Sequence, residues 1–174
     1  MILTGEEIKK EVLNNRIHIK PFFSENLNPN SYNYHLGPII LEISDSVVDP
    51  KRKSKVKKIK LSSKGFVLRP GRIYLGSTIE EIGSDYYVTT LIGRSSVGRL
   101  GLYLQITADL GHMGSKHCWT LELCVVQPLI VYPKMKIGQV SFWEPFGAPL
   151  TEKFDGKYQK YCVPKISEMY KNIL

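Results

Sequence analysis

Short apolar runs, rich in β-branched and aromatic residues, dominate the pattern of hydrophobic and polar positions from residue 38 onward. Gly, Pro, Asp or Lys separate eight such runs, which cover residues 38–43, 65–70, 72–79, 86–92, 101–107, 119–126, 129–133 and 137–143. Closely spaced short strands of this kind are typical of an all-β barrel or sandwich. The pattern therefore predicts a mainly β fold. Residues 24–37 are rich in turn formers and are expected to form turns.

The first residues follow a helical period instead. Thr4 can cap a helix, and Glu7 completes a capping box three residues later. Ile8 and Val12 then place apolar side chains on one helix face, and the Asn-Asn pair at 14–15 is a plausible stop. We predict a short N-terminal helix that packs on the domain.

The length of 174 residues suits one domain, 1–174, and the hydrophobic fraction of 43% excludes wholesale disorder. No run approaches the ~18 apolar residues of a membrane helix, so no membrane partner is expected. Cys118, Cys124 and Cys162 are too few and odd in number for a disulfide framework, which indicates a reducing, cytoplasmic setting. Without a CxxC pair, a structural zinc site is not expected.

The net charge is +8, from 24 Lys and Arg against 16 Asp and Glu, which first suggests a polyanionic partner. Residues 51–60, KRKSKVKKIK, contribute seven of those positive charges and no acid, so the rest of the chain stands at only +1. We expect this basic run to be a solvated surface hairpin or loop. The alternative is a nucleic-acid patch, but no RRM, zinc-finger or clear helix-turn-helix pattern accompanies it, so nucleic acid is not the expected partner.

Residues 93–102, GRSSVGRLGL, are the first candidate for chemistry. The arginines offer forked donors for phosphate oxygens, the serines add hydroxyls, and the glycines allow close backbone approach. These residues are Arg94, Ser95, Ser96, Gly98, Arg99 and Gly101. The segment suits a phosphorylated ligand, although it is not a Walker loop, and a polar turn between strands is the alternative.

Glu122, in the run HCWTLELCVV, is the second candidate. On a strand, alternation places Glu122 on one face with Cys118, Thr120 and Cys124, away from the larger apolar residues. Burial there would raise the pKa of the carboxyl and make Glu122 a candidate general base or acid. The alternative is an edge-strand glutamate that points to water.

Two weaker signals complete the search. His112, His117 and Cys118 lie close in sequence, but His117 and Cys118 would point apart on a strand and no fourth ligand is evident, so a metal site is not predicted. The tail, residues 155–174, begins with DGKYQKY, in which lysine and aromatic side chains could close over a phosphorylated nucleotide. A short helix is expected after Pro164.

The segment GRSSVGRLGL, followed by TLEL and KIGQVSF, resembles the dCTP deaminase branch of the dUTPase-like superfamily. NPNSYNYHLG, LRPGRIYLGSTIE and the late KYQ extend the similarity from about residue 2 to 162. The resemblance implies a dUTPase-like β-barrel (a distorted jelly roll) that assembles as a homotrimer with active sites between subunits.

The resemblance further implies hydrolytic deamination of dCTP to dUTP and ammonia without catalytic zinc, with Mg²⁺ travelling on the triphosphate. By position, Glu122 is the general base. Ser95 and Arg99 help to place the water and stabilise the site, and the Ala108 carbonyl orients the water. The implied substrate-binding residues are Arg94, Ser95, Ser96, Val97, Gly98, Arg99, His112, Thr120, Leu121, Glu122, Gln139, Lys157 and Tyr158.

This sequence departs from the family pattern at several places. His112 stands where the family has an Asp near the sugar, Asn33 replaces an Asp, and Tyr161 replaces a Gln. The segment between Glu122 and Gln139 is about two residues short. Because the Glu-Ser-Arg core is kept, we expect a pyrimidine-nucleotide site whose sugar or nucleotide preference is altered.

Two other functions stay open. The first is a dUTP pyrophosphatase, alone or combined with deamination; His112 and the missing glycine-rich C-terminal motif of ordinary dUTPases argue against it. The second is a non-catalytic nucleotide-binding regulatory protein. The retained Glu122, Ser95 and Arg99 argue against it, because binding alone would not need all three.

Overall fold

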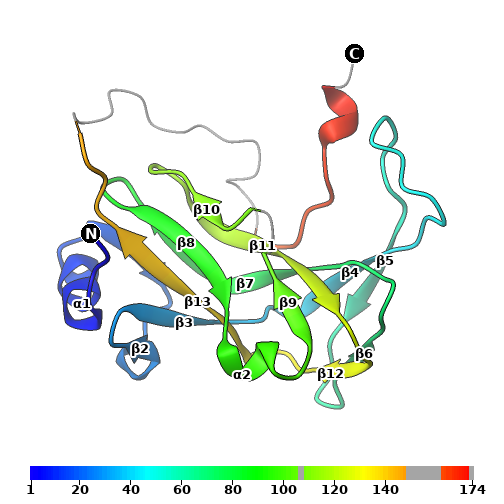
Figure 1. Cartoon of the computed structure of the whole chain (residues 1–174), viewed down its shortest axis with the longest axis horizontal. Helices are drawn as coiled ribbons and strands as arrows, with labels where there is room; N and C mark the ends of the chain where they lie inside the picture. The colour runs from blue at the N-terminus through cyan, green and yellow to red at the C-terminus, as the bar shows by residue number, and fades with distance from the viewer. Residues whose placement is uncertain (106–107, 148–161, 173–174) are drawn as a thin grey trace.

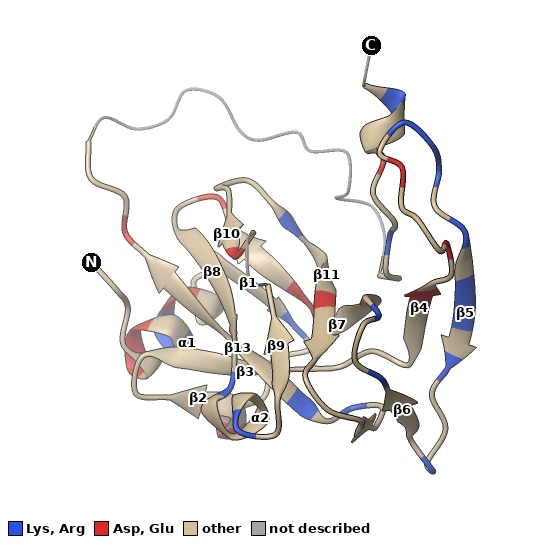
Figure 2. Cartoon of the chain, turned by 45° about the vertical axis from the view of Figure 1, so that its right-hand side comes forward, with Lys and Arg blue, Asp and Glu red and all other residues tan. Residues whose placement is uncertain are grey.

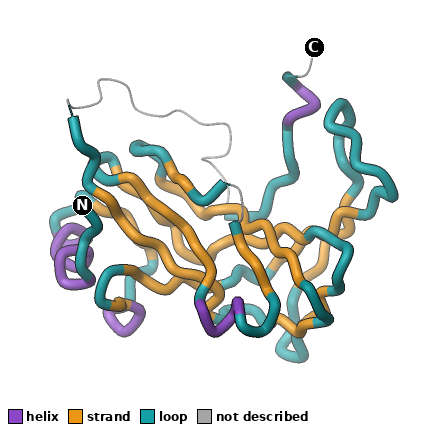
Figure 3. The backbone as a smooth tube through the Cα atoms, viewed as in Figure 1, coloured by secondary structure: helices purple, strands orange, loops and turns teal. Residues whose placement is uncertain are grey.

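The computed structural model describes residues 1–105, 108–147 and 162–172. Within these residues the fold is mainly β, as the apolar runs predict, and all strand pairs are antiparallel. Two large sheets face each other, and a small pair of strands lies at one end (Figure 1). The short helices lie at the periphery of the strands (Figure 3).

The first large sheet has six strands in the order β5-β4-β7-β11-β9, with β1 also paired to β7. Its strands are β1 (Ile17–Lys20), β4 (Ile39–Ile43), β5 (Val56–Lys60), β7 (Tyr74–Ser84), β9 (Leu102–Leu104) and β11 (Lys116–Val125).

The second sheet has the order β10-β8-β13-β3-β2. Its strands are β2 (Leu27–Asn28), β3 (Ser31–His35), β8 (Val88–Gly93), β10 (Leu110–Gly111) and β13 (Lys136–Trp143). The small sheet pairs β6 (Phe66–Leu68) with β12 (Leu129–Val131). The helices are α1 (Gly5–Leu13), α2 (Ser95–Gly98) and the 3₁₀ turns η1 (Ser24–Asn26) and η2 (Met169–Lys171).

One hydrophobic core joins the two large sheets. The six-stranded sheet contributes Ile82, Leu121 and Leu123, and the five-stranded sheet contributes Val140 and Phe142, each fully buried. Every predicted apolar run contains a strand because these alternating side chains must leave water on one face.

The turn-forming residues of 24–37 do form the turn η1, but the segment also contains a strand that their composition does not indicate, because β3 occupies residues 31–35. Tyr32 and Tyr34 are fully buried in the core, which favours a strand despite the turn-forming residues around them. Asn33 is accommodated because its Nδ2 donates to the Asn28 side chain, 3.1 Å away, and to the Asn26 carbonyl at 3.2 Å. Turn-forming residues are tolerated in a strand when hydrogen bonds satisfy their side chains.

Helix α1 begins as predicted, since the Thr4 hydroxyl accepts a hydrogen bond from the Glu7 N–H at 3.4 Å. Glu7 itself reaches Lys10 instead of returning to Thr4, so only half of the capping box forms. Asn14 caps the C-terminus, as the Asn-Asn pair indicates, and the short turn η2 follows Pro164.

The basic run forms the exposed hairpin that was predicted. Strand β5 pairs with β4 at the edge of the six-stranded sheet, and Lys57, Lys58 and Lys60 are exposed. Basic side chains concentrate on this strand (Figure 2). Among the described residues, no helix is long and apolar enough to span a membrane.

Candidate active site

Glu122 lies on β11, between β7 and β9 in the six-stranded sheet. Its neighbours Leu121 and Leu123 are fully buried in the core, so alternation directs Glu122 to the opposite face, as predicted. The side chain is half-buried, and this burial raises the pKa of the Glu122 carboxyl above its usual range. A raised pKa makes the carboxylate a stronger base, which suits it to accept a proton.

A bulge precedes Glu122 on the same strand. The pairing of β11 with β7 shifts register between Cys118 and Thr120. Beyond the bulge the Thr120 hydroxyl accepts a hydrogen bond from the Lys165 N–H at 3.1 Å. The C-terminal segment of the chain therefore lies against β11 close to the carboxylate.

Gln105 connects Glu122 to Ala108. Its Oε1 accepts a hydrogen bond from the Glu122 N–H at 2.9 Å, and its Nε2 donates to the Ala108 carbonyl at 3.3 Å. Ala108 is exposed, as a carbonyl that orients a water molecule needs to be. Sequence reasoning missed Gln105, although an amide side chain inside the apolar run 101–107 was a signal of its own.

Helix α2 presents the predicted phosphate-binding side chains. Ser95, Ser96 and Arg99 are exposed, and Arg94, at the end of β8, is half-buried with its Nη1 3.5 Å from the Lys136 carbonyl. The Val97 side chain is buried in the core, so only its backbone is available to a ligand.

The two glycines of this segment differ in what they do. A side chain at Gly98 would meet nothing within 4 Å, so the backbone there has open space in front of it. Gly101 has a φ of 82°, and a Cβ there would lie 2.6 Å from the Val126 side chain. Gly98 thus permits close approach of a ligand, whereas Gly101 is required by the turn.

The other predicted substrate-binding residues are dispersed. His112 is exposed in the loop after β10, and Gln139 on β13 accepts a hydrogen bond from the Ser31 hydroxyl at 2.9 Å. The Leu121 side chain belongs to the core, which leaves its backbone for a ligand. Lys157 and Tyr158, the predicted closing residues, lie outside the described residues.

The two groups of candidate catalytic residues lie on different elements. Glu122 is on β11, and Ser95 and Arg99 lie on or beside α2. In the described part of the chain, neither Ser95 nor Arg99 makes a hydrogen bond or ion pair with Glu122. Strand β9 lies between the two elements, because it pairs with β11 and contacts α2, which lies at the lower edge of the view in Figure 1.

The histidine and cysteine considered as metal ligands are engaged in packing. The His117 ring lies 4.3 Å from the Trp119 ring, its Nδ1 is 2.9 Å from the Cys118 carbonyl oxygen, and burial lowers the pKa of His117. Cys118 is bonded to another cysteine. The described residues contain no group of three or more His, Cys, Asp or Glu side chains that could hold a metal ion.

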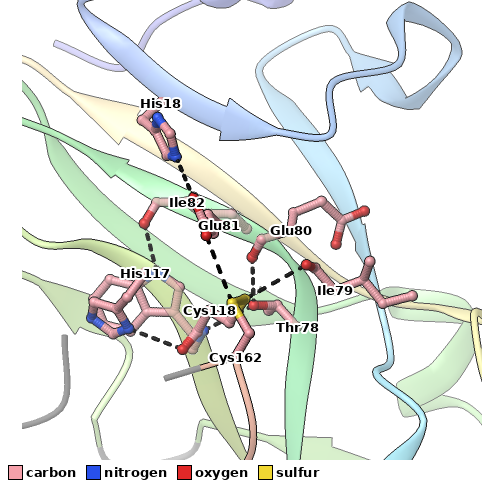
Figure 4. The surroundings of a disulfide bond; sticks show 10 residues. His18, Thr78, Ile79, Glu80, Glu81, Ile82, His117, Cys118 and Cys162 are labelled. Carbon is pink, nitrogen blue, oxygen red and sulfur yellow. Dashed lines mark hydrogen bonds and ion pairs between the residues drawn. A yellow bond between two sulfur atoms is a disulfide. The ribbon is translucent and has the colours of Figure 1, made fainter. Parts of the chain in front are cut away.

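Cys118 and Cys162 form a disulfide bond, with their Cα atoms 4.7 Å apart (Figure 4). Glu81 lies beside it, with Oε1 3.8 Å from the Cys162 sulfur and Oε2 2.9 Å from His18 Nε2. The bond does not fit the reducing setting that the cysteine count indicated. The cysteine count gave no sign of it, because the two cysteines are 44 positions apart in sequence. Only the packing of the C-terminal segment on β11 brings them together.

Comparisons with known proteins agree with these features. A sequence model of the dCTP deaminase-like family matches residues 2–145. A "dCTP deaminase, dUMP-forming" from Hathewaya histolytica is 44% identical over 95% of this chain and 90% of that relative. A relative of the same name from Clostridium acetobutylicum is 39% identical over 100% of this chain and 99% of its own length, and one from Leptospira biflexa is 42% identical over 99% and 98%.

A solved structure has a similar fold. The crystal structure of 2'-deoxycytidine 5'-triphosphate deaminase from Agrobacterium tumefaciens aligns with a TM-score of 0.64 over 81% of this chain. The aligned region is 47% of that longer chain and is 19% identical, so this match bears on the fold alone. Taken with the family match over most of its length, these likenesses show that the chain belongs to the dCTP deaminase-like family.

Proposed function

We propose that this chain is a cytoplasmic hydrolase that deaminates dCTP, with Glu122 as the general base. The observation that carries the proposal is the half-buried Glu122. Burial raises the pKa of its carboxyl, and its backbone N–H is joined through the Gln105 amide to the carbonyl of the exposed residue Ala108. The names of the relatives from Hathewaya and Leptospira support dCTP as the substrate.

The chemistry follows from what a carboxylate can do. Glu122 takes a proton from a water molecule while the water oxygen bonds to carbon 4 of the cytosine ring. Glu122 then delivers the proton to the exocyclic amine as the carbon–nitrogen bond breaks. The balance is dCTP and water in, dUTP and ammonia out, and the carboxylate is regenerated.

The remaining residues would hold and orient the substrate. Ser95 and Arg99 would help to place the water and stabilise charge in the site, and Arg94 and Ser96 would bind phosphates through charge-assisted hydrogen bonds. Thr120 and Gln139 would line the nucleoside pocket, with Lys157 and Tyr158 in the closing tail. Mg²⁺ would arrive on the triphosphate, as the resemblance to the family implies.

A homotrimer with sites between subunits would join the two parts of the site. Glu122 lies on β11 and the exposed Ser95 and Arg99 lie on or beside α2, and within the described part of one chain no hydrogen bond or ion pair joins them. Mixing E122Q with R99A subunits tests this arrangement. About a quarter of wild-type activity is expected to return, because one interface in four then combines an intact Glu122 with an intact Arg99. Recovery at the level of either variant alone would place both residues in the same subunit.

A bifunctional enzyme is the second candidate, favoured by the words "dUMP-forming" in the names of several relatives. In this version the same site also hydrolyses dUTP to dUMP and pyrophosphate. His112 stands where related dUTPases carry a loop Asp that positions or activates water. The water that hydrolyses dUTP would therefore need another residue to position or activate it.

His112 also bears on substrate choice. It is exposed in the loop after β10, at the position where the family has an Asp near the sugar. We propose that this change alters sugar or nucleotide preference. Turnover of dCTP, CTP and dCMP, measured side by side, tests the idea, and a strong preference for dCTP would contradict it.

Two parallel incubations and a binding assay distinguish the main functions. The protein is mixed with Mg²⁺ and either dCTP or dUTP, ammonia is quantified, and dCTP, dUTP and dUMP are separated by ion-exchange chromatography. Binding of dCTP is measured separately by calorimetry. Ammonia with dUTP supports a deaminase, and ammonia with dUMP and pyrophosphate supports the bifunctional enzyme. dUMP formed only from supplied dUTP indicates a pyrophosphatase. Binding of dCTP without any product indicates a regulatory protein and refutes the proposal.

A further inference from the structure

Gln105 lies at the point where the pairing between β9 and β11 stops. The ladder ends with Leu104 opposite Leu123, and the next pair would be Gln105 with Glu122. Gln105 instead has a φ of 47°, in the left-handed region that residues other than glycine rarely adopt. Conformations of this kind persist where surrounding contacts hold them, and they gather at functional sites. The backbone of Gln105 therefore turns away from β11 at the position of Glu122.

The Gln105 side chain accepts the hydrogen bond from Glu122 that the backbone of a continuing β9 would accept. Its Oε1 lies 2.9 Å from the Glu122 nitrogen, where a carbonyl of a continuing β9 would otherwise be expected. Its Nε2 lies 3.3 Å from the Ala108 oxygen. With only 7% of its surface exposed, Gln105 holds both bonds largely away from competing water.

The partners determine which way the amide faces. The Glu122 N–H can only donate and the Ala108 carbonyl can only accept, so the amide oxygen must face Glu122 and the amide nitrogen must face Ala108. A side chain that lacks either the donor or the acceptor cannot make both bonds. The pair of bonds thus requires an amide of this length.

This link matters for a water molecule that is to attack a ring carbon. A water that donates one hydrogen to the Glu122 carboxylate and the other to the Ala108 carbonyl has a lone pair left to direct at the electrophile. The separation of the two acceptors therefore sets the direction of attack. The Ala108 oxygen has two lone pairs, so donation from Gln105 leaves one for the water.

We propose that Gln105 is a positioning residue that holds the Glu122 strand position and the Ala108 carbonyl at the spacing required by the attacking water. The inference rests on the proposed deaminase function and deepens it. Gln105 does not itself contact the reacting atoms; it acts through the two groups that do.

Gln127 provides a matched comparison. It is also a glutamine with a backbone partner, since its Nε2 donates to the Leu100 carbonyl at 3.2 Å, but it is exposed and lies after the end of β11. The substitutions Gln105→Met and Gln127→Met remove an amide from side chains of similar length. Only the first breaks the link between Glu122 and Ala108.

The test measures kcat and KM for ammonia release from dCTP by wild type, Q105M and Q127M. For Q105M we expect kcat to fall about 10- to 100-fold with KM changed less than about threefold, because the loss is in orientation of the water rather than in binding. Q127M is expected to match wild type. Folding of each variant is checked by thermal unfolding and by its oligomeric state.

A second variant keeps the proposal testable if Q105M does not fold. In Gln105→Glu the acceptor for the Glu122 N–H remains, but the donor to Ala108 is lost and a second carboxylate lies near Glu122. Repulsion should move the acid limb of the kcat–pH profile upward by about one pH unit. On the plateau above that limb, kcat should also be lower than in wild type, because the donor to Ala108 is missing. A residue with a merely structural role would lower the melting temperature without lowering this plateau.

Two results would overturn the inference: folded Q105M with kcat within twofold of wild type, or an undiminished plateau kcat in Q105E. A rise in KM at constant kcat would also overturn it, since Gln105 would then be a binding residue. Failure of the proposed function appears separately, as a wild-type protein that releases no ammonia from dCTP.

Discussion

The six-stranded sheet ends in two different ways. At one end, β5 exposes Lys57, Lys58 and Lys60, within a run that holds seven of the 24 basic residues. Toward the other end, β11 holds a single half-buried carboxyl, Glu122, whose pKa is raised by burial. The positive charge is thus concentrated at one end of the sheet, and the candidate catalytic group lies toward the other. The pKa of an ionisable group shifts when the group is partly removed from water, and groups with shifted pKa values cluster at functional sites.

The lysine-rich end has a structural explanation of its own. Strand β5 is an edge strand, and its unpaired backbone groups could pair with another chain. Exposed lysines on such a strand oppose edge-to-edge association. The net charge of +8 therefore mostly reflects the exposed hairpin that includes this edge, and the anion-binding candidates Arg94 and Arg99 contribute little to it.

The largest effect is expected at the Glu122 end. Glu122→Gln keeps the size of the side chain but removes the group that accepts a proton, so ammonia release should fall about 10³-fold or more. Stability should be unchanged or higher, because a partly desolvated charge is removed. Product assays and thermal unfolding measure the two effects.

The matched control is Glu42→Gln on β4, at the other end of the sheet, which should keep activity within about twofold of wild type. Near-wild-type ammonia release by E122Q would refute the general-base assignment. If E122Q does not fold, the pH dependence of wild-type activity becomes the test of Glu122.

The pH dependence gives the second effect. A general base works in its ionised form, and the pKa of Glu122 is raised above the ordinary 4.5, so activity should be lost as the pH falls through that raised value. We expect kcat to fall about tenfold per pH unit on the acid side, with an apparent pKa above 4.5. An acid limb centred at or below 4.5 would contradict the role of burial.

The third effect concerns the N-terminal half of β11, where the disulfide joins Cys118 to the C-terminal segment. With 44 positions between the cysteines, breaking the bond should cost about 2–4 kcal/mol. A reductant should therefore lower the melting temperature of wild type. The melting temperature of Cys162→Ser should equal that of wild type in reductant, whether or not reductant is present. Cys124→Ser, at the exposed free cysteine, is the control and should match wild type. Labelling of three thiols in unreduced wild type would show that the bond does not form.

The smallest effect is expected at the β5 end. Replacing Lys57, Lys58 and Lys60 by Gln should change kcat/KM for dCTP by less than about twofold, because exposed charges far from a site are screened. Retention on heparin is expected to fall. A large loss of turnover would show that the hairpin takes part in catalysis, and loss of nucleic-acid retention alone would give the run a separate role.

Much of the fold was readable from local pattern. The apolar runs predicted strands at all eight positions, and Thr4 and the Asn-Asn pair at 14–15 marked the ends of α1. Alternation also put Glu122 on the face opposite Leu121 and Leu123. These features depend on neighbours within a few residues. The hydrophobic period and the capping residues therefore predict them.

Other features depend on distant partners. Glu11 is buried on α1 because the Tyr87 hydroxyl, 2.6 Å away, and Arg16 Nε, 3.1 Å away, both donate to its carboxylate, and no local pattern indicates that pairing. Strand β3 was missed because the burial of Tyr32 and Tyr34 outweighs the turn preference of the residues between them.

Local sequence is enough to predict the strand-rich class, the helix ends, the basic hairpin and the residue types of the site. Which of these residues come together depends on the tertiary fold. It raised the pKa of Glu122 by removing water, joined Cys118 to Cys162 across 44 positions, and placed Gln105 between Glu122 and Ala108. The physical reason is that propensity and alternation act between near neighbours in sequence, whereas desolvation and hydrogen-bond geometry depend on everything that packs around a group.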